Sequence, residues 1–151
     1  MKKSFILNLS LVVLSVTLCG CQTLGVGASD EELISTTMAE WKAAMAAKDI
    51  DKLMATFSDK YVSTRGTGKD SMREFMTKAF DEGFMDNVEV NVENVQITIE
   101  GDKAMFGPVE FFADRGTFRL EYSLQKENGA WLIVGSKRYE SSSGVRFLNN
   151  A

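Results

Sequence analysis

The chain has 151 residues, of which 44% are hydrophobic and 25% charged, with one proline, no histidine and a formal net charge of -4. This composition suits a single compact domain with a sizeable core and excludes a chain that is disordered throughout. Loss of Lys2 and Lys3, the only charges before residue 21, takes the net charge from -4 to -6. Because the sequence also lacks a cluster of Lys and Arg, we expect no binding to nucleic acid.

The N-terminal residues predict an export signal that ends in a lipid anchor. Lys2 and Lys3 precede an apolar run, Phe5 to Leu18, which is shorter than the ~20 residues of a membrane-spanning helix. The next residues, Leu18-Cys19-Gly20-Cys21, resemble the bacterial lipoprotein signal, with Cys19 where that signal usually has Ala, Ser or Thr. The resemblance implies cleavage before Cys21, attachment of diacylglycerol to its thiol and acylation of its new amine.

We therefore expect residues 1–20 to be a signal peptide and residues 21–30 a lipidated tether. One acyl chain gives only marginal membrane attachment, whereas several together make a stable anchor. Gln22, not aspartate, follows Cys21, so the resemblance implies the outer membrane, facing the periplasm, in a cell that has two membranes. The alternative is a plain secretory signal with an incidental cysteine. In the lipoprotein interpretation no cysteine pair is left for a disulfide.

Residues 31–83 predict three helices. The first follows a cap at Ser29 or Asp30, and the second follows a cap at Asp49. The third begins at Asp70 or Ser71, where Ser71 and Glu74 have capping-box spacing, and it stops near Gly83. A short strand or extended segment is expected at residues 61–64. The helical apolar stripes comprise Leu33, Ile34, Thr37, Met38, Trp41 and Met45, then Ile50, Leu53, Met54 and Phe57, then Met72, Phe75, Met76, Ala79 and Phe80.

Residues 88–139 predict four antiparallel strands joined by turns at residues 100–102, 114–116 and 127–129. Val88, Val90 and Val92 have the opposite parity to Val95, Ile97 and Ile99, which predicts a one-residue bulge near Glu93-Asn94. Gly107-Pro108 marks a bend, bulge or edge in the next strand. The predicted fold class is α+β: three helices packed on a strongly bent, four-stranded antiparallel meander plus a short extra strand. The space between helices and sheet is a candidate pocket.

Three segments resemble the nuclear transport factor 2-like superfamily, the cone-shaped fold shared with ketosteroid isomerase and related polyketide cyclases. They are residues 41–51 (WKAAMAAKDID), residues 57–61 (FSDKY) and residues 128–134 (NGAWLIV). The resemblance covers about Glu31 to Arg138 and implies one such domain at residues 31–139, followed by a C-terminal tail at residues 140–151. Val145, Phe147 and Leu148 suggest that this tail docks on the domain. These motifs specify the fold far better than an activity.

The catalytic part of this resemblance is weak. In the isomerase branch a carboxylate base follows the second helix, but the corresponding Val62-Ser63-Thr64-Arg65 contains no acid. The sequence has no histidine, no metal-spaced Cys/His set, no phosphate loop and no nucleophile elbow, so we expect neither a cofactor nor a metal site. Asp49 and Asp59 are explained by a helix cap and a turn. Glu110, between apolar residues, is the one weak catalytic candidate.

Two classes of function remain open. The first is a non-catalytic envelope lipoprotein whose cone binds a small apolar ligand, or whose sheet binds a protein partner. Tyr61 and Tyr122 would then offer hydrogen bonds, and Arg65 near the open end would meet an anionic group. The predicted pocket residues are Trp41, Phe57, Tyr61, Arg65, Phe75, Phe111 and Tyr122. A filled core without a cavity is the alternative for these side chains.

The second class is a cofactor-free acid/base enzyme, such as an isomerase, dehydratase or cyclase. It requires a buried carboxylate with a raised pKa that faces the pocket, a role for which only Glu110 is suggested. Separately, a polar row on the outer face of the sheet would suit either solvent or a homodimer interface. That row comprises Arg119, Glu121, Ser123 and Gln125.

Overall fold

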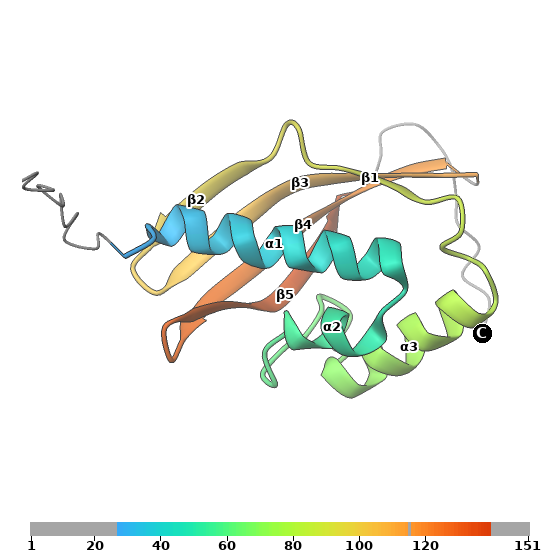
Figure 1. Cartoon of the computed structure of the whole chain (residues 1–151), viewed down its shortest axis with the longest axis horizontal. Coiled ribbons are helices and arrows are strands. Elements are labelled where there is room, and N and C mark those ends of the chain that lie inside the picture. The colour runs from blue at the N-terminus through green and yellow to red at the C-terminus, as the bar shows by residue number, and fades with distance from the viewer. Residues whose placement is uncertain (1–26, 115, 140–151) are drawn as a thin grey trace, which may run out of the picture.

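The computed structural model describes residues 27–114 and 116–139; the signal peptide, Cys21 and the tail expected from the sequence lie outside these ranges. Figure 1 shows α1 lying across a curved sheet, with α2 and α3 following toward one end. None of the described helices has the length and apolar character needed to cross a bilayer. The elements are α1 (Asp30–Ala47), α2 (Ile50–Ala55), α3 (Lys69–Asp81), β1 (Glu89–Asn91), β2 (Gln96–Glu100), β3 (Lys103–Ala113), β4 (Gly116–Glu127) and β5 (Ala130–Tyr139). The expected α+β class is confirmed.

Local capping fixes the first two helices as the sequence predicts. Ser29 Oγ accepts from the Glu32 amide at 3.2 Å, and Glu32 Oε2 accepts from the Ser29 amide at 2.7 Å, which completes a capping box. Lys48, whose φ is 54°, caps the C-terminal end of α1, and Asp49 then caps α2 by accepting from the Lys52 amide at 3.0 Å. This tight joint turns the chain so that both helices pack on one face of the sheet.

Helix α3 starts earlier than expected, and the predicted Ser71–Glu74 capping box is wrong. Gly68 precedes the helix without a side-chain cap, and Lys69 is its first residue. Lys69 Nζ donates to the Phe57 carbonyl at 2.7 Å and to Asp59 Oδ1 at 2.8 Å, so a contact with the preceding loop fixes the helix start instead. The predicted stop is confirmed: Gly83 has φ of +72°, and the Phe84 amide donates to the Ala79 carbonyl.

The first long strand of the expected meander is two strands. Both β1 and β2 pair with β3, giving the order β1-β3-β4-β5 with β2 also on β3. The predicted one-residue bulge is wrong. Asn91 pairs with Glu110 and Gln96 pairs with Gly107, so the chain advances five residues from β1 to β2 while β3 advances only three. Asn91 Oδ1 accepts from the Glu93 amide at 2.7 Å and stabilises this wider turn. The apolar residues on the core side remain those expected, apart from the 37% exposed Ile99: Val88, Val90, Val92, Val95 and Ile97.

Residues 61–64 form an extended segment along β5 and not a regular strand. The Val62 amide donates to the Val134 carbonyl at 3.0 Å, and the Thr64 amide donates to the Ser136 carbonyl at 3.3 Å. Only isolated bridges occur here, Phe57 with Ile133 and Val62 with Gly68 among them. The fifth strand of the sheet therefore comes from the division of the first long strand, while residues 61–64 supply a wall at the β5 edge.

A bulge in β3 sets which of its side chains face the helices. The β3–β4 register shifts between Phe106 and Val109, where Gly107-Pro108 was expected to bend or bulge the strand. Phe106 and Val109 are consequently both buried on the helix side, together with Phe111. Without this extra residue, strict alternation would place residues 108 and 110 inward instead. The bulge thus turns Phe111 toward the helices and Glu110 away from them.

A second bulge, in β5, has the same effect further along the sheet. The β4–β5 register shifts where Ser123 pairs with Gly135 and Leu124 pairs with Ile133. Beyond the bulge, Ser136 pairs with Tyr122 and Arg138 with Leu120, so these two β5 side chains share the face of the inward β4 residues. Without the bulge, alternation from Ile133 would turn Lys137 toward this face, and Ser136 and Arg138 would point away from it.

Gly107 provides a test of the β3 bulge. A Cβ atom at Gly107 would lie 3.0 Å from the Cα of Glu121, a backbone atom of β4 that cannot rotate away. We expect Gly107→Ala to lower the free energy of unfolding by about 1–3 kcal/mol through this overpacking. Gly135→Ala is the matched control, because its nearest neighbour, the Val62 carbonyl oxygen, would lie at an ordinary 3.5 Å. Urea denaturation measures both, and equal losses would contradict the close β3–β4 approach.

Helix α1 is fastened to the sheet around Trp131. Trp131 Nε1 donates to Asp30 Oδ1 at 3.0 Å, Lys126 Nζ donates to the same oxygen at 2.5 Å, and Thr37 Oγ1 donates to the Trp131 carbonyl. The hydrogen bonds from Lys126 and then Trp131 hold the pKa of Asp30 below its usual value. Since the buried hydrophobic cluster runs from Ile34 to Ile133, a chain of residues 22–151 retains the whole core and is expected to fold.

Candidate functional site

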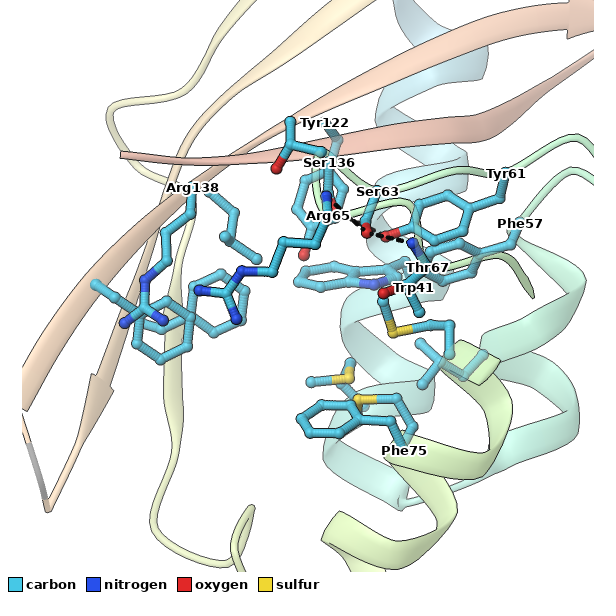
Figure 2. Close-up of a pocket in the computed structure, with 18 of the residues that line it drawn as sticks. Trp41, Phe57, Tyr61, Ser63, Arg65, Thr67, Phe75, Tyr122, Ser136 and Arg138 are labelled. Atoms are coloured by element: carbon cyan, nitrogen blue, oxygen red, sulfur yellow. Dashed lines mark hydrogen bonds between the residues drawn. The ribbon is translucent and has the colours of Figure 1, made fainter. Parts of the chain in front are cut away.

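A cavity of about 410 Å³ lies between the helices and the concave face of the sheet and opens to solvent. Its volume falls within the roughly 300–1,000 Å³ of typical ligand sites. Figure 2 shows side chains from helices, the extended loop and the sheet converging on it. The lining is mostly apolar: Trp41, Met45, Leu53, Phe57, Tyr61, Ser63, Thr64, Arg65, Thr67, Met72, Phe75, Met76, Met85, Phe111, Phe118, Leu120, Tyr122, Ser136 and Arg138.

All seven side chains predicted to line a pocket lie around this cavity: Trp41, Phe57, Tyr61, Arg65, Phe75, Phe111 and Tyr122. Trp41 from α1 forms the aromatic floor, with its ring centroid 6.0 Å from that of Phe111 in an edge-to-face arrangement and 5.1 Å from that of Tyr122. Phe75, by contrast, is 64% exposed. The cavity therefore has a buried aromatic floor and an exposed aromatic side chain at its opening. What occupies it stays a prediction.

Two tyrosines place hydroxyl groups in the apolar wall. Tyr61 Oη and Ser136 Oγ are 2.7 Å apart and share a hydrogen bond. Burial raises the pKa of Tyr61, and burial together with the nearby Tyr61 raises the pKa of Tyr122 well above its usual value. Both hydroxyls thus stay protonated at neutral pH and can donate to a ligand, as the sequence suggests for this pair.

The opening carries two arginines. Arg65 lies in a loop that Ser63 closes, because Ser63 Oγ accepts from the amides of Arg65 at 3.3 Å and Thr67 at 3.0 Å. The guanidinium of Arg138 lies 4.8 Å from the ring centroid of Phe118. In Figure 2 the Arg65 and Arg138 side chains extend into the same part of the cavity. Within the described ranges, the lining includes no Asp or Glu.

Sequence reasoning missed Ser136 and Arg138. Alternation along the fourth predicted strand would have turned Lys137 inward, and only the β5 bulge reverses that assignment. One signal was present, since Gly135 interrupts a strand whose first positions, 131–134, are all apolar and so show no alternation. A glycine in that position is typical of a bulge or a close backbone approach, and Gly135 indeed lies against the Val62 carbonyl.

Glu110 does not line the cavity. It pairs with Arg119 across β3 and β4, accepting from Nε at 2.8 Å and lying 2.6 Å from Nη2, on the face opposite Val109 and Phe111. Asp49 caps α2 and Asp59 lies in a turn, as their structural interpretations predict. Asp59 also pairs with Lys69 at 2.8 Å, a contact that the sequence did not indicate. An acid/base enzyme would require a carboxylate that faces the pocket. Among residues 27–114 and 116–139, no carboxylate does so. The same residues contain no cluster of three or more possible metal ligands.

The polar row on the outer face of β4 makes contacts within the chain. Arg119 pairs with Glu110, Tyr139 Oη donates to Glu121 at 2.6 Å, and the side-chain Nε2 of Gln125 donates to Asp102 Oδ2 at 3.3 Å. These bonds reach the neighbouring strands β3 and β5 and the turn before β3, and they give the face a satisfied, solvent-compatible surface. A homodimer on this face stays a prediction.

Comparison with known proteins agrees with this architecture. A family model described as the SnoaL-like domain matches residues 34–138. A protein of unknown function with a cystatin-like fold from Nostoc punctiforme is 18% identical, with a TM-score of 0.60 over 78% of this chain and 95% of its own. A nuclear transport factor 2-like protein of unknown function from Shewanella oneidensis is 14% identical, with a TM-score of 0.58 over 74% of this chain and 100% of its own.

A third similar structure is a putative calcium/calmodulin-dependent protein kinase II association domain from Xanthomonas campestris. It is 12% identical, with a TM-score of 0.58 over 78% of this chain and 91% of its own. A search of curated proteins found no match. At these identities the structural likenesses show the fold alone, and they agree with the resemblance that residues 41–51, 57–61 and 128–134 carry.

Proposed function

This chain belongs to the SnoaL-like family, and we propose that it is a non-catalytic cell-envelope lipoprotein whose cavity binds a small, largely apolar ligand. Family membership does not itself choose a function, because one fold hosts many. The observation that carries the proposal is the open cavity of about 410 Å³, whose lining is apolar apart from a few polar groups. That combination is typical of sites that bury an apolar ligand and orient it with a few hydrogen bonds.

The lining chemistry favours binding over catalysis. Proton transfer at a bound substrate requires a positioned acid or base within hydrogen-bond reach. The titratable groups of the lining are two tyrosines, whose pKa values are raised, and two arginines. The raised pKa values keep both tyrosine hydroxyls protonated near neutral pH, so neither serves as a base there. The described lining of the cavity therefore offers hydrogen-bond donors to a ligand that binds without reacting, and it has no carboxylate base.

Titration with N-phenyl-1-naphthylamine tests ligand binding. This neutral apolar probe becomes fluorescent in apolar surroundings, and the chain of residues 22–151 contains the whole core. We expect saturable binding of one probe per folded chain, which is lost when the domain is unfolded in urea. Absence of saturable binding would contradict the proposal and favour a domain that uses its sheet to bind a protein partner.

Membrane attachment through Cys21 is the second part of the proposal, and it rests on the signal-like sequence before that residue. We expect Cys21→Ser to leave an unprocessed or soluble protein that no longer incorporates labelled palmitate. Cys19→Ser is the matched control, because Cys19 leaves with the signal peptide and its replacement is expected to preserve labelling. Undiminished palmitate labelling of the Cys21 variant would refute the anchor.

A further inference from the structure

We infer that the ligand carries a neutral acceptor oxygen, such as the carbonyl of a ketone, ester or amide, and that the Tyr122 hydroxyl binds this oxygen inside the cavity. This inference rests on the proposed function and adds the chemical class of the ligand. It requires a hydrogen-bond donor that faces the cavity, that no described residue already uses, and that lies too deep for an ionised partner.

Tyr122 differs from the other tyrosines in its lack of a partner. The sequence contains three tyrosines. Tyr61 Oη shares a hydrogen bond with Ser136 Oγ at 2.7 Å. Tyr139 Oη donates to Glu121 at 2.6 Å. Tyr122 is only 4% exposed, and its hydroxyl forms no hydrogen bond within the described part of the chain. Phenylalanine would serve packing equally well here, because it has no hydroxyl to satisfy.

The hydroxyl of Tyr122 faces the cavity. Among the described residues, every fully covered side-chain nitrogen or oxygen has a hydrogen-bond partner. Because Tyr122 Oη has none, part of its surface borders open space, and the space that Tyr122 lines is the cavity. An apolar ligand that fills the cavity would remove solvent from this hydroxyl. That removal costs free energy unless the ligand itself supplies an acceptor.

The neighbouring Trp41 favours an acceptor on the ligand over a donor. Figure 2 shows Tyr122 and Trp41 meeting between the sheet and the helices, and their ring centroids are 5.1 Å apart. The Nε1–H group of Trp41 also has no acceptor among the described residues, so it too borders open space. An indole N–H can only donate. The described lining contains no Asp, Glu, Asn or Gln, which leaves donors and hydroxyl groups to meet the ligand.

The depth of these two side chains favours a neutral acceptor. Both Tyr122 and Trp41 are buried, and the edge of the aromatic pair between Trp41 and Phe111 adds an apolar neighbour. A carboxylate at this depth would lose its hydration, and neutral donors alone would not offset that loss, whereas a carbonyl loses much less. Burial, followed by the nearby Tyr61, raises the pKa of Tyr122, so its hydroxyl stays protonated and donates.

Two ligands that share one skeleton isolate the acceptor oxygen. 2-Acetylnaphthalene carries a carbonyl, whereas 2-isopropylnaphthalene has a methyl group in the place of its oxygen. Each is titrated against N-phenyl-1-naphthylamine bound to the chain of residues 22–151. We expect Tyr122→Phe to weaken the binding of 2-acetylnaphthalene about tenfold, which corresponds to ~1.4 kcal/mol, and to leave that of 2-isopropylnaphthalene unchanged. An equal effect on both ligands, or no effect on either, would overturn the inference while sparing the proposed function.

Tyr139→Phe is the matched control, because it removes the same hydroxyl from a tyrosine that binds Glu121 and does not line the cavity. It is expected to leave both affinities unchanged. A loss equal to that of Tyr122→Phe would show that the effect does not come from the cavity and would overturn the inference. Absence of saturable binding of N-phenyl-1-naphthylamine to the wild-type chain would instead reject the proposed function.

Stability separates a hydroxyl that binds ligand from one that holds the fold. Without ligand, Tyr122→Phe is expected to leave the urea midpoint unchanged or to raise it, because no described group loses a partner. Tyr61→Phe is the comparison: it removes the partner of Ser136 Oγ and is expected to lower the midpoint. An equal fall in both variants would show that the Tyr122 hydroxyl has a partner within the fold, which would overturn the inference.

Infrared spectroscopy tests the contact itself. An isotopic label in the carbonyl of 2-acetylnaphthalene identifies its stretching band in difference spectra of the complex. We expect this band at a lower frequency in the wild-type complex than in the Tyr122→Phe complex, because a hydrogen bond weakens the carbonyl bond. Equal frequencies in the two complexes would overturn the inference, since a merely structural role of Tyr122 would not shift the band.

Discussion

Replacement of Trp41 by alanine is expected to lower the free energy of unfolding by about 3–5 kcal/mol. Trp41 is 2% exposed and forms the floor of the cavity, where it contacts the rings of Phe111 and Tyr122. Its removal deletes a large buried surface and leaves a void. The surrounding side chains cannot fill this void, because they already border an open cavity. Because a small domain has only ~5–15 kcal/mol of total stability, this one change would remove a large share of it. Urea denaturation followed by circular dichroism measures the loss.

Phe75→Ala is the matched comparison for Trp41→Ala, because Phe75 lines the same cavity but is 64% exposed. We expect a loss of less than about 1 kcal/mol, in line with an exposed position. The affinity for the neutral probe should fall even so, since Phe75 covers the opening. Similar destabilisation by the two changes would contradict the division into a structural floor and an exposed opening.

Leu120→Trp is expected to block ligand binding while the domain stays folded. Leu120 lies on the inward face of β4, opposite Val109 and Arg138, and its side chain lines the cavity. An indole at this position would occupy space that a ligand otherwise fills, so the affinity for the neutral probe should fall more than about tenfold. The cost of overpacking, typically about 1–3 kcal/mol in a filled core, should be smaller here because the space is open.

Thr117→Trp supplies the control for Leu120→Trp. Thr117 is an exposed β4 residue that pairs with Phe112, and it lies on the outer face of the sheet. The same indole there is expected to leave probe affinity unchanged. If both variants bind the probe like the wild type, the probe does not occupy the cavity. If Leu120→Trp unfolds the domain, the space beside Leu120 is a packed core.

Much of the fold follows from local sequence signals. The turn at Glu127-Asn128-Gly129 predicts a tight hairpin, and Asn128 and Gly129 have φ of 50° and 86°, as such a turn requires. Asp49 as a helix cap and Gly83 as a helix stop are local as well. The start of α3 could not be predicted in this way, because Lys69 binds the Phe57 carbonyl and Asp59, partners that become neighbours only after folding.

The cavity was predictable where alternation is regular and not where a bulge reverses it. Trp41 and Tyr122 belong to uninterrupted patterns, and both line the cavity. Apolar residues flank Glu110 in the sequence, which favours a buried position, but the β3 bulge turns it outward. Arg138 shows the converse, since alternation places it outward and the β5 bulge turns it inward. One inserted residue per strand exchanges the two faces, which a single sequence signals only through a nearby glycine or proline.

Native mass spectrometry tests most directly whether the cavity holds a small, largely apolar ligand in the cell. The chain of residues 22–151 is exported through a cleavable signal peptide in the cell that makes it and is then purified without detergent. We predict a population with one discrete additional mass that is absent from Leu120→Trp and retained in Thr117→Trp. The bare sequence mass in all three proteins, unchanged after incubation with lipid extract from the same cells, would contradict the account.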